Sequence, residues 1–368
     1  MPKTLTVNRG ASDAVRALLR SLIEGGKVEG VFTLARVNNK GVGYALIRDP
    51  EKIEQAEPFY PWMPSSGGKQ LSRLVSLSRR PRPLAVVLRP CELRAFVELV
   101  KLEQCRRDKL VLISSTCGGV YPVETLSDGN PDDRVPRYWN GLKAGEGQPD
   151  ARDSCRACKH FIPYNADLTV ALVGCGDLDE KCTFFVNSEA GQACLEGQGG
   201  VWGQSAVETE ATEKLAAARD AERERQREEL HLGSLGIEGL VGIFGKCVGC
   251  RSCREVCPIC YCTLCDFDSA KYENEPAWFA RELNSRKGVR VPPATLLFQM
   301  GRMVHMSVSC VGCGMCSDVC PVNIPVATLF SSVGEANQKL FDYVPGKDES
   351  QKPPFVKAEL NELENLTV

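Results

Sequence analysis

The sequence lacks long apolar runs, carries almost no net charge and begins without a targeting segment, and each absence excludes a class of protein. Apolar runs such as Leu84–Leu88 are far shorter than the roughly 20 residues that a membrane-spanning helix needs. In the 368-residue chain, 45 basic and 47 acidic side chains give a net charge of −2, and no basic stripe suited to nucleic acid appears. The first ten residues contain neither an apolar signal segment nor a twin arginine. We therefore expect a cytoplasmic protein with no membrane span and no nucleic-acid partner.

Histidine is scarce too, whereas cysteine is abundant. The chain has three histidines, and no Ser-His-Asp set or paired-carboxylate motif is recognisable, so hydrolytic chemistry has no support. In a small secreted chain the 19 cysteines would suggest disulfides. Here the chain is long and the cysteines fall at the spacings of iron ligands, which need a reducing compartment, and an anaerobic one for exposed clusters.

Two cysteine runs share one pattern, Cys-x2-Cys-x2-Cys-x3-Cys-Pro, which is the ligand pattern of a two-cluster ferredoxin. A single Cys-x2-Cys pair is also typical of zinc knuckles and redox pairs, but two complete runs closed by proline favour 4Fe-4S clusters. Three cysteines of a run can hold one cluster from a single loop, and the fourth is carried to the neighbouring cluster. We therefore predict one cluster on Cys247, Cys250, Cys253 and Cys320, and a second on Cys310, Cys313, Cys316 and Cys257.

The sequence that precedes the two cysteine runs predicts an α/β domain. A helix-spaced apolar face over residues 12–23 is followed by short strand-like segments that alternate with helical ones. Residues 127–152 are rich in Gly, Pro, Asp and Asn and predict a loop. The expected strands are Gly30–Val37, Val42–Ile47, Leu84–Leu88, Leu110–Ser114 and Leu168–Gly174.

The rest of the chain predicts a charged helix and a mostly helical ferredoxin domain. Residues 205–232 are rich in Ala, Glu and Arg, which favours a solvated spacer helix, with a partner-docking arm as the alternative. A long insert separates the two cysteine runs and includes a helix over Pro293–His305 whose apolar face would be Leu296, Leu297, Met300 and Val304. The predicted domains are 1–204 (α/β, with a mixed sheet and flanking helices), 205–235 (charged linker helix), 236–345 (helical dicluster ferredoxin) and 346–368 (flexible tail).

Four further cysteines suggest a third cluster. Cys91 and Cys117 follow predicted strands, and Cys155 and Cys158 form a Cys-x2-Cys pair after the predicted loop. Cysteines at the strand ends of one sheet can converge, and four thiolates complete one 4Fe-4S site. The alternative is that these residues are small buried apolar side chains.

The same segments carry a family resemblance. LAVVLRPCELRAFVELVKL, KLVLISSTC and CRACKHFIPYNADLTVALVG resemble, in order, three elements of the coenzyme F-420 hydrogenase and dehydrogenase beta-subunit family. The resemblance to the beta-subunit family covers about residues 12–200, and the ferredoxin runs follow this region. The beta-subunit resemblance implies FAD, a third 4Fe-4S cluster on Cys91, Cys117, Cys155 and Cys158, and exchange of hydride with a reduced deazaflavin. The C-terminal part, with its long insert between the two cysteine runs, is similar to the helical ferredoxins of heterodisulfide reductase and succinate dehydrogenase subunits.

The chain departs from this family where a Gly-Gly pair usually precedes the first helix, because Arg9, Gly10 and Ala11 stand there instead. A glycine turn that opens a helix elsewhere offers amide donors and a cation for a pyrophosphate. Arg89 beside Cys91 could also face an anionic cofactor. The predicted flavin contacts are Ser65, Ser66, Gly67, Gly68, Lys69 and Arg89.

Two functions follow. The first is an iron–sulfur flavoprotein subunit of an anaerobic oxidoreductase complex, which converts hydride from a deazaflavin or similar donor into single electrons for a heterodisulfide-reductase-like, formate dehydrogenase or hydrogenase partner. The second is a flavin-free adaptor that docks and relays electrons between subunits. A separate question is whether Cys260, Cys262 and Cys265 hold a further cluster with Cys175 or Cys182, or are buried thiols beside the predicted ones.

Overall fold

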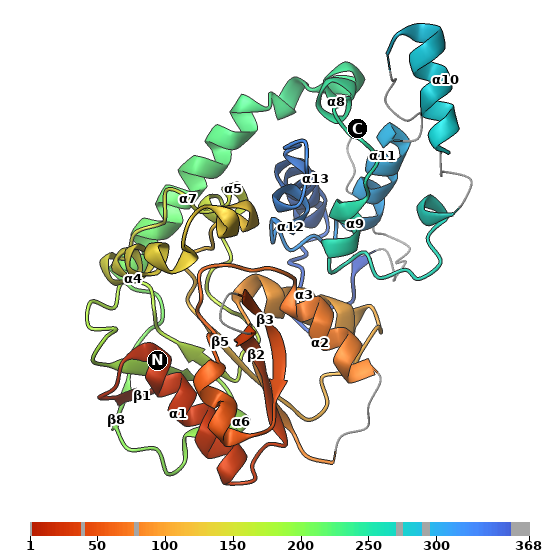
Figure 1. Cartoon of the computed structure of the whole chain (residues 1–368). Coiled ribbons are helices and arrows are strands. Elements are labelled where there is room, and N and C mark those ends of the chain that lie inside the picture. The colour runs from red at the N-terminus through yellow and green to blue at the C-terminus, as the bar shows by residue number, and fades with distance from the viewer. Residues whose placement is uncertain (1, 38–40, 77–80, 270–274, 289–294, 355–368) are drawn as a thin grey trace.

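The computed structural model of the chain describes residues 2–37, 41–76, 81–269, 275–288 and 295–354. An α/β domain forms one end of the molecule and the helices of the C-terminal third gather at the other (Figure 1). The predicted combination of a mixed α/β sheet with a helical C-terminal region is therefore confirmed. No helix in the described part of the chain is long and apolar enough to cross a membrane.

The sheet has eight strands among the described residues, in the order β3-β2-β4-β5-β6-β7-β1-β8. Strands β2, β4, β5 and β6 run parallel, while β3, β7, β1 and β8 are joined by antiparallel pairing. The bounds are β1 (Lys3–Val7), β2 (Gly30–Val37), β3 (Gly41–Ile47), β4 (Leu84–Val87), β5 (Leu110–Ser115), β6 (Leu168–Val170), β7 (Cys182–Val186) and β8 (Val201–Gln204).

Helices cover both faces of the sheet. The α-helices are α1 (Ala11–Glu24), α2 (Gly67–Ser76), α3 (Pro90–Lys101), α4 (Val135–Ala144), α5 (Asp153–Arg156), α6 (Glu189–Leu195), α7 (Glu210–Glu229), α8 (Gly236–Phe244), α9 (Ser252–Val256), α10 (Pro276–Arg286), α11 (Thr295–Met306), α12 (Met315–Asp318) and α13 (Val326–Leu340). Short 3-10 helices are η1 (Pro50–Gln55), η2 (Val123–Ser127), η3 (Pro131–Arg134), η4 (Leu232–Ser234) and η5 (Asp266–Asp268).

The central strands are apolar on both faces, as expected for parallel strands buried between layers. Ala85 and Val87 of β4 join the core under α1, whereas Leu84 and Val86 join the core under α2 and α3. Because β4 and β5 pair in parallel, they end at the same edge of the sheet. This edge faces the C-terminal helices (Figure 1).

Two predictions about this domain need correction. The loop predicted over 127–152 contains η3 and α4, because Tyr138 and Leu142 are buried in the core and Gly145, with φ of 70°, closes the helix. The strand predicted over Leu168–Gly174 is β6, which ends at Val170. Polar composition concealed α4 because only one narrow face of it is apolar.

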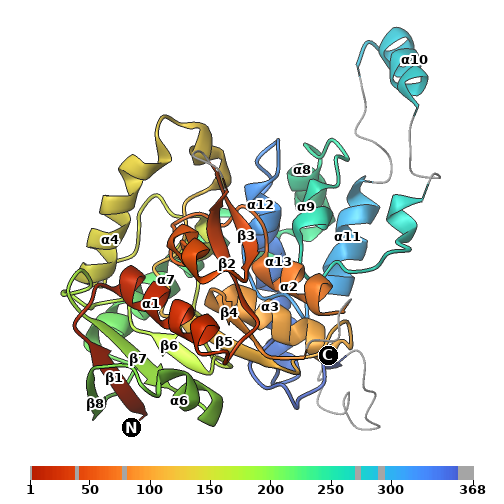
Figure 2. The ribbon, with the colours of Figure 1, turned by 60° about the horizontal axis from the view of Figure 1, so that its bottom comes forward.

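The C-terminal domain forms its own core. Phe244 of α8, Met306 of α11, and Leu329 and Phe330 of α13 are buried together around the cysteine runs. Helix α10 stands apart from this core in both ribbon views (Figures 1 and 2).

Helix α11 buries only part of the predicted apolar face, because, of its four residues, Leu296 alone packs against the C-terminal core. Leu297, Met300 and Val304 are exposed, while Gln299 and Arg302 are almost completely buried. The start of the helix predicted at Pro293 lies outside the described residues. The polar face is buried because it meets the cysteine sulfurs.

Charged residues 210–229 form α7, which runs from the α/β domain towards α8 (Figure 1). It is not solvated on all sides, because Leu215 and Arg219 are buried against the α/β domain. Its role as a link between two domains, and the predicted domain boundaries, stay predictions.

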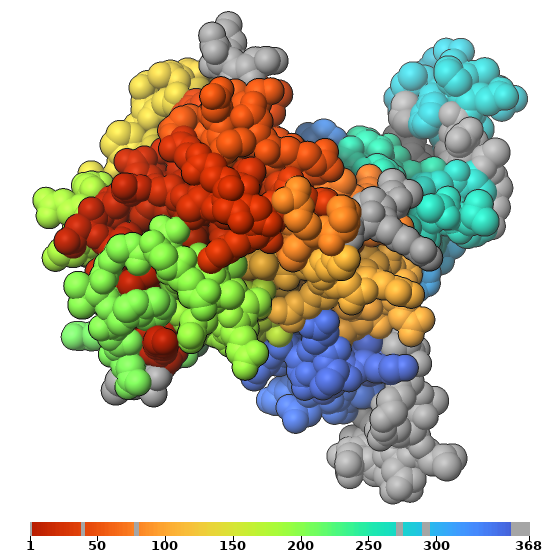
Figure 3. All heavy atoms as spheres, turned by 90° about the horizontal axis from the view of Figure 1, so that it is seen from below, coloured from red at the N-terminus to blue at the C-terminus, as the bar shows by residue number. Residues whose placement is uncertain are grey.

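The start of the predicted flexible tail, at Gly346, and the residues just before it pack on α3. The Tyr343 hydroxyl donates to Glu98 at 2.7 Å, and the Gly346 amide donates to the same carboxylate at 2.9 Å. Seen from below, this last described segment (blue) lies against the segment that carries α3 (orange) (Figure 3). Residues 355–368 lie outside the described residues.

Candidate iron–sulfur centres

The second predicted cluster set lines one cavity. Cys257 comes from the first run, and the other three cysteines come from the second run, as the crossed assignment predicts. The cavity has a volume of about 430 Å³ including its open mouth, and its other walls include Ile259, Met306, Val311 and Phe330. The cysteines in its lining are Cys257, Cys310, Cys313 and Cys316. An apolar cavity with four thiols fits the size and the ligand chemistry of a 4Fe-4S cluster.

Two cysteines of the first predicted set, Cys247 and Cys253, face α11. Gln299 Nε2 lies 3.7 Å from Cys247 Sγ and 3.9 Å from Cys253 Sγ, so one amide approaches both sulfurs. Cys250 on the same loop is exposed. Cys320, the predicted fourth ligand, packs against the same hydrophobic core as Cys247, and the Ile324 amide donates to its sulfur at 3.4 Å.

The four cysteines of the third predicted set converge at the edge where β4 and β5 end. Cys91 lies in the first turn of α3, shortly after β4, and Cys117 follows β5. Cys155 lies in α5 and Cys158 follows it. Gly119 joins two of them: its amide donates to Cys117 Sγ at 3.4 Å, and a Cβ added to it would lie 3.1 Å from the Cys155 Cβ. With φ of 104°, this position requires glycine.

The pKa shifts of the thiols also indicate that the cysteines of the third set lie close together. Burial raises the pKa of Cys91 well above its usual value, and the nearby charges of Glu92, Cys313, Cys117 and Cys155 raise it further. Burial likewise raises the pKa of Cys155 to about 11, and Cys117 and Cys158 add to the effect.

The raised pKa values disfavour thiolates at Cys91 and Cys155, and bound iron would supply the positive charge that stabilises them. Among the described residues, no three His, Cys, Asp or Glu side chains gather closely enough to hold a single metal ion. A four-iron cluster is larger than an ion and needs its thiolates farther apart.

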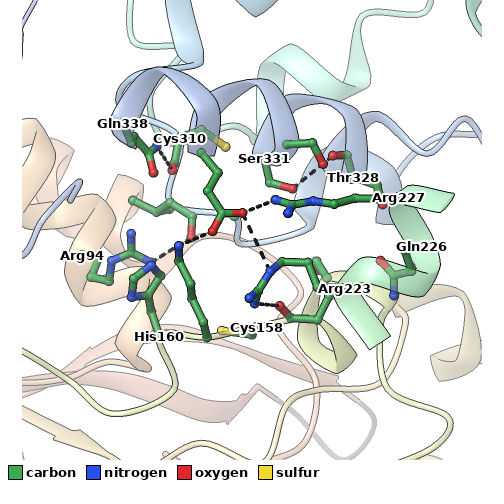
Figure 4. A pocket seen from close by; sticks show the side chains of 17 residues that line it. Arg94, Cys158, His160, Arg223, Gln226, Arg227, Cys310, Thr328, Ser331 and Gln338 are labelled. Atoms are coloured by element: carbon green, nitrogen blue, oxygen red, sulfur yellow. Dashed lines mark hydrogen bonds and ion pairs between the residues drawn. The ribbon is translucent and has the colours of Figure 1, made fainter. Parts of the chain in front are cut away.

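The second and third sets are neighbours. Met63, Val120 and Met315 form a small buried cluster against which Cys91, Cys155 and Cys313 pack. A second contact is a pocket whose lining includes both Cys158 and Cys310. Figure 4 shows Cys158, His160 and Arg94 on the α/β side of this pocket and Cys310 on the other.

Ion pairs close the rim of that pocket. Glu335 of α13 pairs with Lys159 and with Arg227 of α7, and lies 3.8 Å from Arg223 (Figure 4). The pairs hold α7, α13 and the Cys158 loop together.

The residues predicted to contact flavin have partners inside the protein. The Gly67 amide donates to Glu92 Oε1 at 2.8 Å, so a buried carboxylate already occupies the start of α2. A Cβ on Gly68 would lie 2.2 Å from the Glu92 carbonyl oxygen, so this glycine lets α2 and α3 pack closely. A pyrophosphate does not fit at a helix start that faces a carboxylate.

The remaining predicted flavin contacts are likewise engaged. Lys69 Nζ donates to the Glu255 carbonyl at 2.6 Å, reaching the ferredoxin domain. The Arg89 side chain is buried, donates to the Tyr60 and Trp62 carbonyls, and lies 3.7 Å from Glu92. Ser65 Oγ accepts from Gln70 at 2.7 Å, and Ser66 Oγ accepts from the Lys69 amide at 3.3 Å.

The extra cysteines divide between the two domains. Cys260 packs in the ferredoxin core, 3.3 Å from Met306 Sδ, and its hydrogen bond lowers the pKa of Cys257 to about 5. Cys175 and Cys182 lie in the core of the α/β domain. The structure therefore does not bring these two to Cys260, and a buried thiol beside the cluster is the reading that fits Cys260.

Comparison with known proteins supports the same interpretation. Residues 243–324, which include both cysteine runs, match the family model of a 4Fe-4S dicluster domain. Over 376 aligned positions the chain is 28% identical to the F420-dependent formate dehydrogenase subunit beta of Methanocaldococcus jannaschii, with 93% of each chain covered. The predicted resemblance to the coenzyme F-420 beta-subunit family is confirmed. The matched domain also supports the prediction of two 4Fe-4S clusters.

A second formate dehydrogenase beta subunit gives a similar match. The F420-dependent formate dehydrogenase 1 subunit beta of Methanococcus maripaludis is 29% identical over 376 aligned positions, with 92% of each chain covered. A chain of the F420-reducing [NiFe] hydrogenase complex from Methanosarcina barkeri matches 65% of this chain and 94% of its own length, with a TM-score of 0.45 and 16% identity. The two formate dehydrogenase beta subunits and the matched dicluster domain confirm the prediction of an iron–sulfur oxidoreductase subunit.

Sequence reasoning missed the polar groups around the sulfurs. Gln299 and Arg302 lie almost fifty residues from the cysteine that they approach, Cys253. A signal was present, because both side chains lie on one helical face of α11.

Proposed function

We propose that this chain relays single electrons through three 4Fe-4S clusters as the beta subunit of a coenzyme F-420-dependent oxidoreductase complex of the formate dehydrogenase type. The observation that supports it best is the placement of Cys91 and Cys155 against the same small apolar cluster as Cys313. Three adjacent cysteine sets then form a continuous route from the sheet edge of the α/β domain to the exposed loop of the first run.

The protein residues supply spacing and dryness along this route. Met63, Val120 and Met315 are each at most 3% exposed and separate the second and third sets with an apolar layer. Such a layer excludes water from the thiolates, and burial and hydrogen bonding to sulfur set the cluster potentials.

The names of the relatives support the electron donor and the partner. Two curated relatives are beta subunits of F420-dependent formate dehydrogenases. We infer that a reduced deazaflavin is the two-electron donor and that a formate dehydrogenase or hydrogenase subunit is the partner. A bound FAD would convert a hydride into single electrons, but the residues predicted to hold its pyrophosphate have internal partners, so we assign no flavin contact.

The iron content of the anaerobically purified chain tests the three-cluster route. About 12 iron atoms per chain match three four-iron clusters, and about eight match the two ferredoxin clusters alone. Cys155→Ala should lower the count from about 12 to about eight. Cys194→Ala is the matched control, because Cys194 is also a cysteine of the α/β domain, is buried and belongs to no cysteine set. A wild-type count of about eight that Cys155→Ala leaves unchanged would remove the third cluster.

A second function is the flavin-free relay, and the internal partners of Gly67, Lys69 and Arg89 favour it. The two functions differ in their donors. A flavin-bearing subunit retains about one FAD and its clusters are reduced by reduced coenzyme F-420. A flavin-free relay retains none and is reduced only by one-electron donors such as reduced methyl viologen.

A further inference from the structure

Some buried arginines in the described part of the chain have no carboxylate partner. Arg89 pairs with Glu92, Arg152 with Asp318, and Arg254 with Asp268. The others form no ion pair among the described residues, although burying an unpaired charge is costly. The six arginines with buried side chains are Arg89, Arg94, Arg152, Arg219, Arg254 and Arg302.

The three without a carboxylate all lie beside predicted cluster cysteines. Arg219 donates to the Cys117 carbonyl at 3.2 Å and stacks on Phe161. The charges of Cys158, Cys91 and Cys310 act on Arg94, and those of Cys253, Cys257 and Cys316 act on Arg302. Thiolates and the clusters that they bind are therefore the negative charges that these arginines meet.

Arg302 lies between the first and second sets. Its Nη1 is 3.0 Å from Cys253 Sγ, a predicted ligand of the first cluster, and its Nη2 donates to the Cys253 carbonyl at 3.1 Å. The same side chain lines the cavity that contains Cys257 and Cys316. Phe330 covers the guanidinium at 5.0 Å, and the residue is 3% exposed.

Arg94 lies between the second and third sets. It projects from α3, whose first turn contains Cys91, and lines the pocket shared by Cys158 and Cys310 (Figure 4). Its Nη1 donates to the Val311 carbonyl, next to Cys310, at 3.1 Å, and its Nε donates to the Pro345 carbonyl at 2.9 Å. The residue is 2% exposed.

A fixed positive charge in a dry site favours the form of a neighbouring centre that carries one more electron. Since arginine stays protonated, the charge is the same before and after the electron passes. In each step one electron leaves one cluster site and enters the next, so the first is oxidised by one electron, the second is reduced by one, and no proton moves.

We propose that Arg302 and Arg94 are positioning charges that raise the reduction potentials of the cluster sites on either side of them, Arg302 for the first and second sets and Arg94 for the second and third. The Arg94 part rests on the proposed third cluster. The Arg302 part requires only the two ferredoxin clusters, so the two parts can fail separately.

Redox titration of the anaerobic full-length chain, followed by electron paramagnetic resonance, tests this inference. Arg302→Gln should shift the reduction equilibrium of the two ferredoxin clusters towards the oxidised form by about tenfold, which is about 59 mV for a one-electron couple. It should leave the third cluster unchanged. Arg94→Gln should do the same to the second and third clusters and spare the first, so each variant is the control for the other. Arg302→Lys, which keeps the charge, should shift the potentials less than Arg302→Gln.

Iron content, measured in parallel, separates the outcomes. Unchanged potentials in a variant with full iron overturn the inference for that residue. Loss of iron from both glutamine variants assigns the arginines to cluster assembly and overturns the inference as well. If the wild-type chain binds about eight iron atoms, the three-cluster proposal fails, and the Arg302 titration still decides its own part.

Discussion

The two cysteine runs have nearly the same backbone and opposite surroundings. Gly249 and Gly312 take φ values of 71° and 66°, and two residues further on Arg251 and Gly314 take 60° and 81°. The side chains then differ: Val248 of the first run is 56% exposed, whereas Val311 at the same place in the second run is 6% exposed.

The α/β domain meets the two runs differently: it covers the Cys310–Gly314 loop of the second run, whereas it reaches the first run near its end, where Lys69 donates to the Glu255 carbonyl. A Cβ on Gly314 would lie 1.8 Å from Ser154 Oγ and 2.9 Å from Ser154 Cβ, so glycine is required there. The equivalent Arg251 has room for a long side chain. The loop of the second run thus lies covered beside the third set. The equivalent loop of the first run lies at the surface. This arrangement suits entry of electrons from the α/β domain and exit at the first run.

The largest expected effect comes from removing one ligand in each run. Cys250→Gly and Cys313→Gly should each lose the iron of one cluster, about four atoms per chain. An external thiol such as 2-mercaptoethanol should restore the iron in the Cys250 variant, because Cys250 is exposed. It should restore the Cys313 variant much less, because Cys313 lines an apolar cavity and is only partly exposed. Equal rescue of both would contradict the contrast between open and enclosed sites.

A smaller effect is expected at the acidic residue that anchors each run. Asp318 follows Cys316, is 3% exposed, and binds Arg152 Nη2 at 2.5 Å and the Val123 amide at 3.1 Å. Asp318→Ala leaves the Arg152 charge buried without its partner, so we expect a loss of about 3–5 kcal/mol in the free energy of unfolding. Urea unfolding of the anaerobic, cluster-loaded chain measures it.

The matched control is Asp268, which binds Arg254 at 2.6 Å behind the first run but is 34% exposed. Because water screens this pair, Asp268→Ala should cost no more than about 1 kcal/mol. A similar loss of unfolding free energy in Asp318→Ala and Asp268→Ala would contradict the burial of the second run by the α/β domain.

The sequence predicted what depends on local spacing and missed what depends on tertiary contact. Cysteine spacing predicted the crossed set that lines one cavity, and strand ends predicted the convergence of Cys91 and Cys117. The apolar face assigned to α11 was wrong in part, because the thiolate-rich core recruits Gln299 and Arg302 in place of leucines. A glycine turn resembles a phosphate-binding turn in sequence, and only the structure shows Glu92 already at the Gly67 amide.

The smallest effect is expected at the paired left-handed positions. Gly314→Ala adds both backbone strain and a clash with Ser154, so it should cost about 1–3 kcal/mol of the unfolding free energy. Arg251→Gly removes strain at φ of 60° and loses a 3.7 Å ion pair between partly exposed side chains, Arg251 and Asp268, so it should change stability by less than about 1 kcal/mol. Both variants should keep their iron, and the same urea unfolding measures both. A cost for Arg251→Gly as large as that for Gly314→Ala would show that backbone conformation, not contact with the α/β domain, distinguishes the two loops.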